Sequence, residues 1–214
     1  MNKLLTIAAA CALAIAATGH AQPNDNALSR LQTRWAQINY QLKDKAQLAA
    51  YEELLEEADV FVQQDPNNAD ILIWSGIIKS SYAGAKGGLG ALKYAKASKA
   101  DLEKALSINA DALAGSAYTS LGTLYFKVPG WPIGFGDDDK AESLLKKALT
   151  INTDGIDPNY FYGEYLRDHH KYADAVRYYE KAQHAPARPG RELADQGRQR
   201  EIASALADAK KHLK

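Results

Sequence analysis

Three short polar stretches carry side-chain types that are used in binding chemistry. Gly84–Gly90 is rich in glycine and contains a lysine, as phosphate-binding loops do. Asp137–Asp139 is a run of aspartates, the oxygen ligands that calcium prefers. Asp168–His170 places two histidines beside an acid, as in some zinc sites.

None of these stretches has the spacing that its chemistry requires. A phosphate loop needs Gly-Lys followed by Ser or Thr, whereas Lys86 is followed by Gly87. Calcium-binding EF-hands alternate their acids, so the contiguous Asp137–Asp139 are better interpreted as charges at a helix N-terminus, with a weak metal site as the alternative. Adjacent histidines on a turn seldom face one metal. We interpret Gly84–Gly90 as a flexible inter-helix loop.

No serine or histidine belongs to a recognisable nucleophile motif. The serines lack the G-x-S-x-G elbow, and no histidine has an acid and a nucleophile beside it in a known pattern. We therefore predict no catalytic residue, no metal ligand and no cofactor. A binding protein is favoured, and an enzyme is kept only as a third hypothesis.

The loop Pro129–Gly136 is the stretch that most favours binding. It contains two large aromatic residues, Trp131 and Phe135, among prolines and glycines. Either the loop folds back and buries them on its own repeat, or they line a ligand cavity or a partner surface. In the second case nearby tyrosines continue the surface. The candidate ligand- or partner-binding residues are Trp131, Phe135, Tyr118, Tyr125, Tyr160 and Tyr162.

The elements that position these residues are predicted to be helices throughout. Apolar residues recur every three to four positions, and no segment shows the alternation of a strand. Asp139 and Glu142 have the spacing of a helix capping box. The predicted helices cover residues 27–42, 46–64, 69–82, a segment ending near 108, 112–126, 140–151, 156–167, 172–183 and 192–213.

Two segments nearly copy each other. Leu102–Asn109 reads LEKALSIN and Leu145–Asn152 reads LKKALTIN, and each follows a helix that contains a glycine. Self-similarity at this scale indicates an all-α solenoid, because a single helix pair cannot bury its apolar face alone.

The segment from Asn159 to Ala182 resembles a tetratricopeptide (TPR) repeat. Gly163 in its first helix, and Ala175 and Ala182 flanking Tyr179 in its second, match the small and large positions of that family. The two middle units resemble the same pattern with longer loops at Gly84–Gly90 and Val128–Asp139, while residues 28–64 fit it less well. The resemblance implies three to four antiparallel helix pairs in a repeat domain (residues 22–190), followed by a C-terminal capping helix (residues 191–214).

A narrower resemblance rests on GGLGALKYAKASKADLEKAL, SAYTSLGTLY, VPGWPIGFGDDDKAESLLKKAL and GIDPNYFYGEYL. These segments are similar to the T-component family of TRAP-type transporters. The similarity implies a non-enzymatic periplasmic accessory protein of a solute uptake system. It would bind a partner solute-binding protein and a small apolar or carboxylated ligand. The alternative is a general TPR scaffold that binds peptide segments of envelope-assembly proteins.

The first 21 residues have the pattern of a secretory signal. A basic start precedes the apolar run Leu4–Ala17, which is short for a bilayer span, and small residues precede a cut after Ala21. A lipoprotein modified at Cys11 and an uncleaved anchor are the alternatives. We expect a periplasmic protein. Its 26 basic and 26 acidic side chains balance, which argues against nucleic acid as a partner, and no later segment is apolar enough to cross a membrane.

Overall fold

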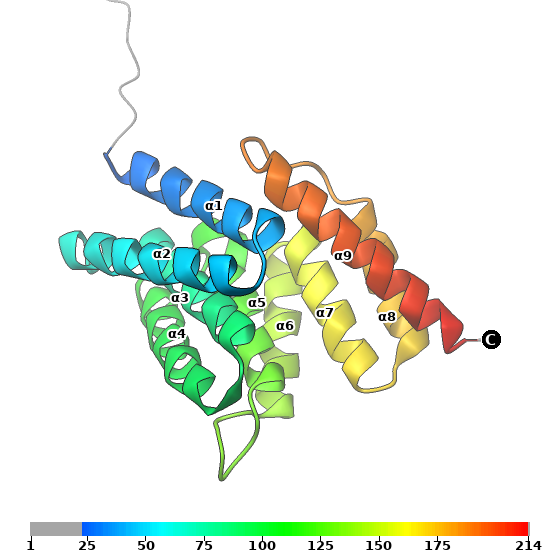
Figure 1. Cartoon of the computed structure of the whole chain (residues 1–214). Helices are drawn as coiled ribbons and strands as arrows, with labels where there is room; N and C mark the ends of the chain where they lie inside the picture. Colours follow the sequence, from blue (N-terminus) through cyan, green and yellow to red (C-terminus); the bar gives the residue numbers. More distant parts are fainter. Residues whose placement is uncertain (1–22, 214) are drawn as a thin grey trace, which may run out of the picture.

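The computed structural model describes residues 23–213, and within that range every regular element is a helix (Figure 1). The predicted all-α fold is confirmed. The helices are α1 (Pro23–Gln41), α2 (Asp44–Gln64), α3 (Ala69–Lys86), α4 (Gly88–Ile108), α5 (Ala112–Lys127), α6 (Asp138–Ile151), α7 (Ile156–Asp168), α8 (Tyr172–Gln183) and α9 (Glu192–Lys211). The predicted signal segment, residues 1–21, and Cys11 lie outside the described residues.

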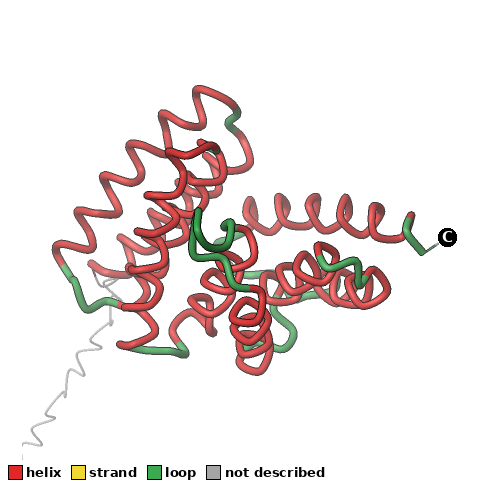
Figure 2. Tube along the Cα trace, turned by 90° about the horizontal axis from the view of Figure 1, so that it is seen from below, coloured by secondary structure: helices red, strands yellow, loops and turns green. Residues whose placement is uncertain are grey.

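Helices that follow each other in the chain pack as neighbours. The pairs α3–α4, α5–α6 and α7–α8 make the most extensive contacts, and each pair packs on the next (Figures 1 and 2). The hairpin α1–α2 precedes them, and α9 follows α8. The result is a helical solenoid, as the repeat pattern predicts.

A small residue facing a large one fixes the crossing point in each of the three central pairs. A glycine in the first helix lies so close to the second helix that an added Cβ would come within 2.7–2.8 Å of the facing side chain. No real Cβ tolerates that distance, so glycine is required for the helices to approach this closely. The facing residues are Gly76 with Leu102, Gly122 with Leu145, and Gly163 with Tyr179.

Two predicted boundaries are wrong. Gly84–Gly90 is not a long loop, because α3 continues to Lys86 and α4 begins at Gly88, with a sharp turn at Gly87 (φ 61°, ψ −178°). The cap of α6 is Asp137, whose side chain accepts a hydrogen bond from the Lys140 N–H at 3.0 Å, and Asp139 lies inside the first turn. In both places the helix extends further than the apolar pattern, because capping and packing rather than periodicity decide where it ends.

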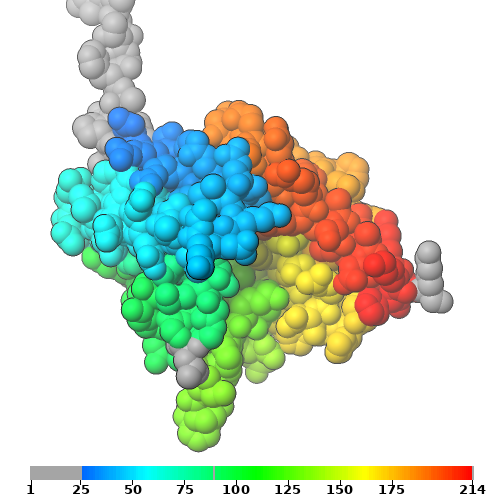
Figure 3. Space-filling model, viewed as in Figure 1, coloured from blue at the N-terminus to red at the C-terminus, as the bar shows by residue number. Residues whose placement is uncertain are grey.

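The long connection between α5 and α6 folds into a compact projection. The Gly136 N–H donates to the Pro129 carbonyl at 3.0 Å and the Gly134 N–H donates to the Gly130 carbonyl at 3.1 Å. This loop extends beyond the ends of the surrounding helices and forms the lime-green protrusion in Figure 3. The long loop predicted at Val128–Asp139 is therefore present, and it covers residues 128–137.

The last helix does more than cover the end of the array. α9 packs on α8, as a capping helix does, and it also contacts α7 and α1. At the contact with α1, the ring of Tyr40 lies against Gly197. Because α9 returns to the first helix, its contact with α1 bounds the concave side of the solenoid at one side.

Candidate binding site

A cavity of about 630 Å³ occupies the concave side of the solenoid. Its described lining residues come from α1, α3, α5, α7, α9 and the turns and connections next to α7 and α9, and none comes from α2, α4, α6 or α8. This space is called the central cavity below. The volume is typical of a site that binds a drug-sized molecule or a short segment of chain.

Aromatic side chains from α1 and α3 form one wall of the central cavity. Trp35 and Trp74 meet edge to face with centroids 5.6 Å apart, and Tyr40 meets Trp35 in the same way at 5.7 Å. The Trp35 Nε1–H donates to the Ser81 Oγ at 2.9 Å, so its polar atom is satisfied. This wall is rigid and apolar, with two of the three tryptophans of the chain in it.

Hydroxyl groups on α3 and α5 form a second part of the lining. The Ser80 and Ser81 hydroxyls both donate to the Ile77 carbonyl at 2.8 Å. On α5, Ser116 donates to the Leu113 carbonyl and Thr123 to the Thr119 carbonyl, each at 2.8 Å. Each of these hydroxyl groups donates its proton to a carbonyl of its own helix. The hydroxyl oxygens therefore retain lone pairs that can accept hydrogen bonds from an occupant.

The backbone is strained where α5 enters the central cavity. Leu113 (φ 47°) and Ala114 (φ 52°) adopt left-handed backbone angles, and both line the cavity. This conformation costs an L-residue roughly 1–2 kcal/mol. Strain of this kind concentrates at binding sites, where the surrounding structure maintains it.

Charged groups from α7, α9 and the α8–α9 connection form the remaining wall. Asp157 lies between two guanidinium groups, with the Arg188 Nη1 at 2.6 Å and the Arg198 Nε at 2.8 Å from its carboxylate oxygens. Burial alone would raise the pKa of Asp157, but Arg198 and Arg188 outweigh burial and hold that pKa at about 2. Arg188 also pairs with Asp195, and Arg198 with Glu201, so each of these two arginines contacts two carboxylates.

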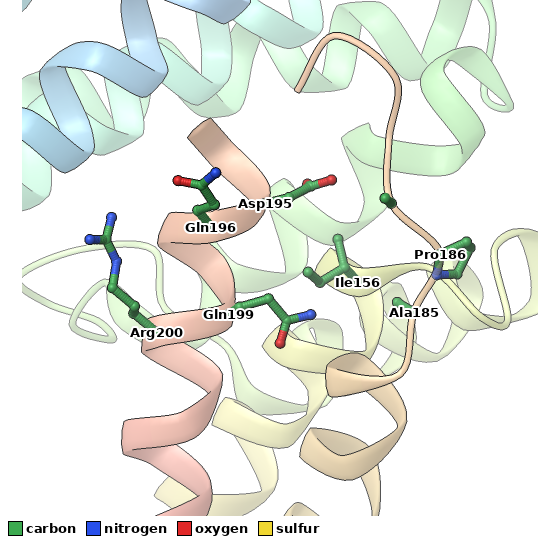
Figure 4. A pocket seen from close by; sticks show the side chains of 8 residues that line it. Ile156, Ala185, Pro186, Asp195, Gln196, Gln199 and Arg200 are labelled. Atoms are coloured by element: carbon green, nitrogen blue, oxygen red, sulfur yellow. The ribbon is translucent and has the colours of Figure 1, made fainter. Parts of the chain in front are cut away.

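A smaller recess of about 480 Å³ adjoins the central cavity between α9 and the α8–α9 connection (Figure 4). Gln199 extends from α9 toward Ile156 and Ala185 in this recess. Its one acidic residue, Asp195, is already paired with Arg188. We therefore take the central cavity as the candidate site.

The residues predicted from the aromatic loop do not line the central cavity. Phe135 folds back onto Tyr125, edge to face at 5.6 Å, whereas Trp131 is 89% exposed at the tip of the loop. The fold-back alternative therefore describes Phe135, and a binding role for the exposed Trp131 stays a prediction. Neither the central cavity nor the recess beside it reaches the Trp131 loop, as the transport hypothesis implied a cavity would.

The predicted tyrosines are mostly core residues. Tyr125, Tyr160 and Tyr162 are buried, and Tyr118 is partly buried. The Tyr162 hydroxyl donates to the Glu142 Oε1 at 3.3 Å, and Tyr160 stacks under the Arg198 guanidinium at 4.6 Å. The binding role of these tyrosines and of the aromatic loop stays a prediction.

Sequence reasoning missed the residues that do line the central cavity. Neither Trp35 nor Trp74 is among the site residues that the sequence predicts. A usable signal was the recurrence of hydroxyl residues in the first helices of successive units, at Ser80–Ser81 and at Ser116–Ser120. Hydroxyl residues are uncommon on a face that packs a dry core, so they mark a face that borders a polar space.

The described residues contain neither a metal-ligand cluster nor a membrane-spanning helix. No group of three or more His, Cys, Asp or Glu side chains in residues 23–213 is arranged to hold a metal ion. None of the helices in the same range combines the length and apolarity that crossing a bilayer requires.

A known structure shares the fold. No protein-family model and no curated protein matches the sequence. Among solved structures, the chain is similar to TTC0263, a thermophilic TPR protein in Thermus thermophilus. The TM-score is 0.56 and the identity 18%, over 85% of this chain and 98% of that one. Two structures of MamA are similar at a TM-score of 0.45 and 18% identity, over 77% and 86% of this chain and 89% and 92% of theirs. The chain therefore has a TPR-like helical-repeat fold.

Proposed function

We propose that this protein is a non-enzymatic scaffold that receives an extended polypeptide segment of a partner protein in the central cavity. The observation that carries the proposal is the composition of the concave face. It combines a rigid aromatic wall with hydroxyl oxygens whose protons are donated to backbone carbonyls of the same helix. Acceptors of this kind suit backbone N–H groups, and aromatic rings suit apolar side chains.

The geometry of α5 supports an extended chain as the occupant. Ser116 and Ser120 both line the cavity and are one helical turn apart, which is about 6 Å along the axis. In an extended chain, N–H groups on one side recur every two residues, at about 6.8 Å. Successive N–H groups of one strand can therefore reach successive hydroxyls.

Tryptophan fluorescence tests the proposal directly. In a Trp131→Phe background only Trp35 and Trp74 remain, and both lie in the central cavity. The probe is a pool of N-acetylated random hexapeptides with free C-termini. We expect a saturable fluorescence change on titration. Ser120→Leu, which adds volume inside the cavity, should raise the half-saturation concentration at least tenfold.

The matched control is Ser107→Leu. Ser107 also donates to a carbonyl of its own helix, at 2.7 Å, but it is exposed on α4 and outside the cavity. It should leave the titration unchanged. The proposal fails if the pool gives no saturable signal, or if Ser120→Leu and Ser107→Leu behave alike.

The narrower role, an accessory component of a TRAP-type uptake system, remains a second proposal. It is supported by the sequence resemblance and by a cavity of a size that suits a small molecule. In that role the protein would hold a small carboxylated or apolar ligand and dock a periplasmic solute-binding protein. Native mass spectrometry of the protein purified from its own host separates the two proposals. A retained small molecule, lost in Ser120→Leu, would favour the transport role, whereas a ligand-free protein that binds the peptide pool would exclude it.

A further inference from the structure

The loop between α5 and α6 ends in an exposed apolar segment, Trp131–Ile133, which is called the apolar tip below. Trp131 is 89% exposed and Ile133 is 62% exposed. Of the large apolar side chains that the structure describes, these two are the most exposed. They belong to the projection that extends beyond the surrounding helices (Figure 3). Large apolar side chains gathered at one exposed point mark an interaction surface.

The backbone of the apolar tip has few donors that need water. Pro132 has no N–H group. The Ile133 N–H donates to the Gly130 carbonyl at 3.2 Å, and the Gly134 N–H donates to the same carbonyl at 3.1 Å. Unpaired backbone N–H groups are strongly disfavoured where water is scarce. The tip can therefore enter an apolar medium with these donors already paired.

The base of the loop rests against the first half of α4. A Cβ added at Gly134 would lie 3.5 Å from the Leu92 Cδ1, and the Lys99 Nζ lies 5.8 Å from the centroid of the Phe135 ring. Figure 1 shows the turn between α3 and α4 at the same end of the molecule as the loop. The apolar tip and the start of α4 therefore present one continuous surface.

The flank that α4 supplies is basic. Residues 86–99 contain four lysines and no acid, so this segment has a net positive charge. Lys99 pairs with Glu103 at 2.7 Å, whereas on the opposite flank Asp137 is paired with Lys140 at 3.2 Å. Long lysine side chains beside an apolar segment place their charges where lipid headgroups would lie. The exposed lysines of this flank are Lys86, Lys93 and Lys96.

We propose that the apolar tip inserts into the interfacial region of a bilayer that contains anionic lipids, with the lysines of α4 at the level of the headgroups. Tryptophan favours this region, because its ring is apolar and its N–H is polar. A protein pocket also suits an apolar tip, but a basic flank beside the tip suits a surface that is negatively charged over a wide area, as an anionic leaflet is.

The proposed contact is peripheral and leaves the central cavity free. A single short loop binds a bilayer weakly and reversibly, because little apolar surface is buried. Neither Trp131 nor Ile133 lines the central cavity, so the inference does not depend on what that cavity binds. The apolar tip would bring the scaffold to a membrane surface while its concave side stays open to a partner.

Trp131 supplies its own reporter for the test. The full chain is titrated with vesicles of phosphatidylglycerol and phosphatidylcholine whose acyl chains carry bromine, which quenches a tryptophan that contacts it. Trp35 and Trp74 are only 7% and 4% exposed, so they are shielded from the label. We expect saturable quenching that unlabelled vesicles do not produce and that Trp131→Phe abolishes.

Two substitutions with matched controls test the apolar and the basic parts separately. Ile133→Ser should raise the lipid concentration at half-saturation by about tenfold, because it removes a large apolar side chain from the interface. Ile108→Ser is its control, since Ile108 is 41% exposed at the far end of α4, and it should have no effect. Any contribution of the rest of the chain to vesicle binding is the same in both variants.

Lys93→Gln should raise the half-saturation concentration by about fivefold on the anionic vesicles. It should have no effect on vesicles of phosphatidylcholine alone, because the attraction requires charged headgroups. Lys104→Gln is the control, because Lys104 is exposed on the same helix but lies in its last two turns. Circular dichroism should show the same helix content in all four variants.

Three results would overturn the inference. The first is the absence of quenching by the labelled vesicles, and the second is quenching that persists in Trp131→Phe. The third is self-association in sedimentation velocity that depends on Trp131 while vesicles are not bound, since the occupant of the tip is then a second copy of the chain. These results leave the proposed scaffold role intact, because that role is tested at Ser120 with the peptide pool.

Discussion

The ring of Tyr40 in α1 lies directly against Gly197 in α9. A Cβ at Gly197 would be 2.4 Å from three carbons of that ring. The Tyr40 hydroxyl also donates to the Glu201 Oε2 at 3.4 Å. The first and last helices of the described chain therefore touch, and this contact bounds the central cavity at one side.

Gly197→Ala is expected to destabilise the protein by about 1–3 kcal/mol, because overpacking a tight contact forces the helices apart. Urea unfolding followed by circular dichroism measures the change. Gly84→Ala is the control. Gly84 is also helical but has no atom within 4 Å of an added Cβ, so alanine should stabilise it by roughly 0.5–1 kcal/mol. Equal effects of the two substitutions would contradict the close α1–α9 contact.

Stability should fall in acid because of Asp157. Its folded pKa of about 2 lies below the roughly 3.9 of an unfolded aspartate. The stabilisation is therefore complete above about pH 4 and is lost as the pH falls through about 2. We expect a contribution of no more than about 2 kcal/mol, since 31% of the side chain is exposed.

Asp157→Asn tests this linkage. It should remove much of the pH dependence of the free energy of unfolding between pH 4 and pH 2, measured by urea titration at each pH. Asp174→Asn provides the comparison, because among residues 23–213 Asp174 pairs with Arg177 alone and its side chain is 46% exposed. If both variants keep the parent protein's dependence of unfolding free energy on pH, Asp157 is not its source.

Ala114→Gly should stabilise the protein by about 1 kcal/mol. Ala114 is exposed and has φ 52°, a conformation that glycine adopts without the clash of a Cβ. Ala100→Gly is the control with the opposite sign. Ala100 is exposed inside α4, where glycine should cost about 1 kcal/mol. If both substitutions destabilise, the left-handed start of α5 is not strained.

Trp131→Ala should change the free energy of unfolding by less than about 0.5 kcal/mol, because the side chain is 89% exposed. Trp74→Ala should cost about 3–5 kcal/mol, because Trp74 is only 4% exposed. Thermal unfolding of both variants checks this contrast. If Trp131 also binds a partner, as the sequence predicts, the alanine variant should weaken that binding without loss of fold.

The sequence by itself determined the helices and their pairing. Helix-period apolar faces and the glycines at positions 76, 122 and 163 predicted stacked hairpins, and each glycine does meet a large side chain. Such features are local, because they depend on residues within one helix pair. The turn at Gly87 and the cap at Asp137 were missed, since a helix end is decided by a few hydrogen bonds that periodicity does not report.

Only the tertiary structure decided where the cavity lies and what lines it. Trp35 and Trp74 come from different helices, and Arg191 lies over the Trp74 ring because α9 folds back onto α1. The packing of α9 against α1 cannot be predicted from residue spacing. It depends on how the curvature of successive helix pairs adds up over the whole array. The tertiary structure also decides why Trp131 is exposed while Phe135 is packed. Two aromatics in one loop look alike in sequence, and only packing against Tyr125 distinguishes them.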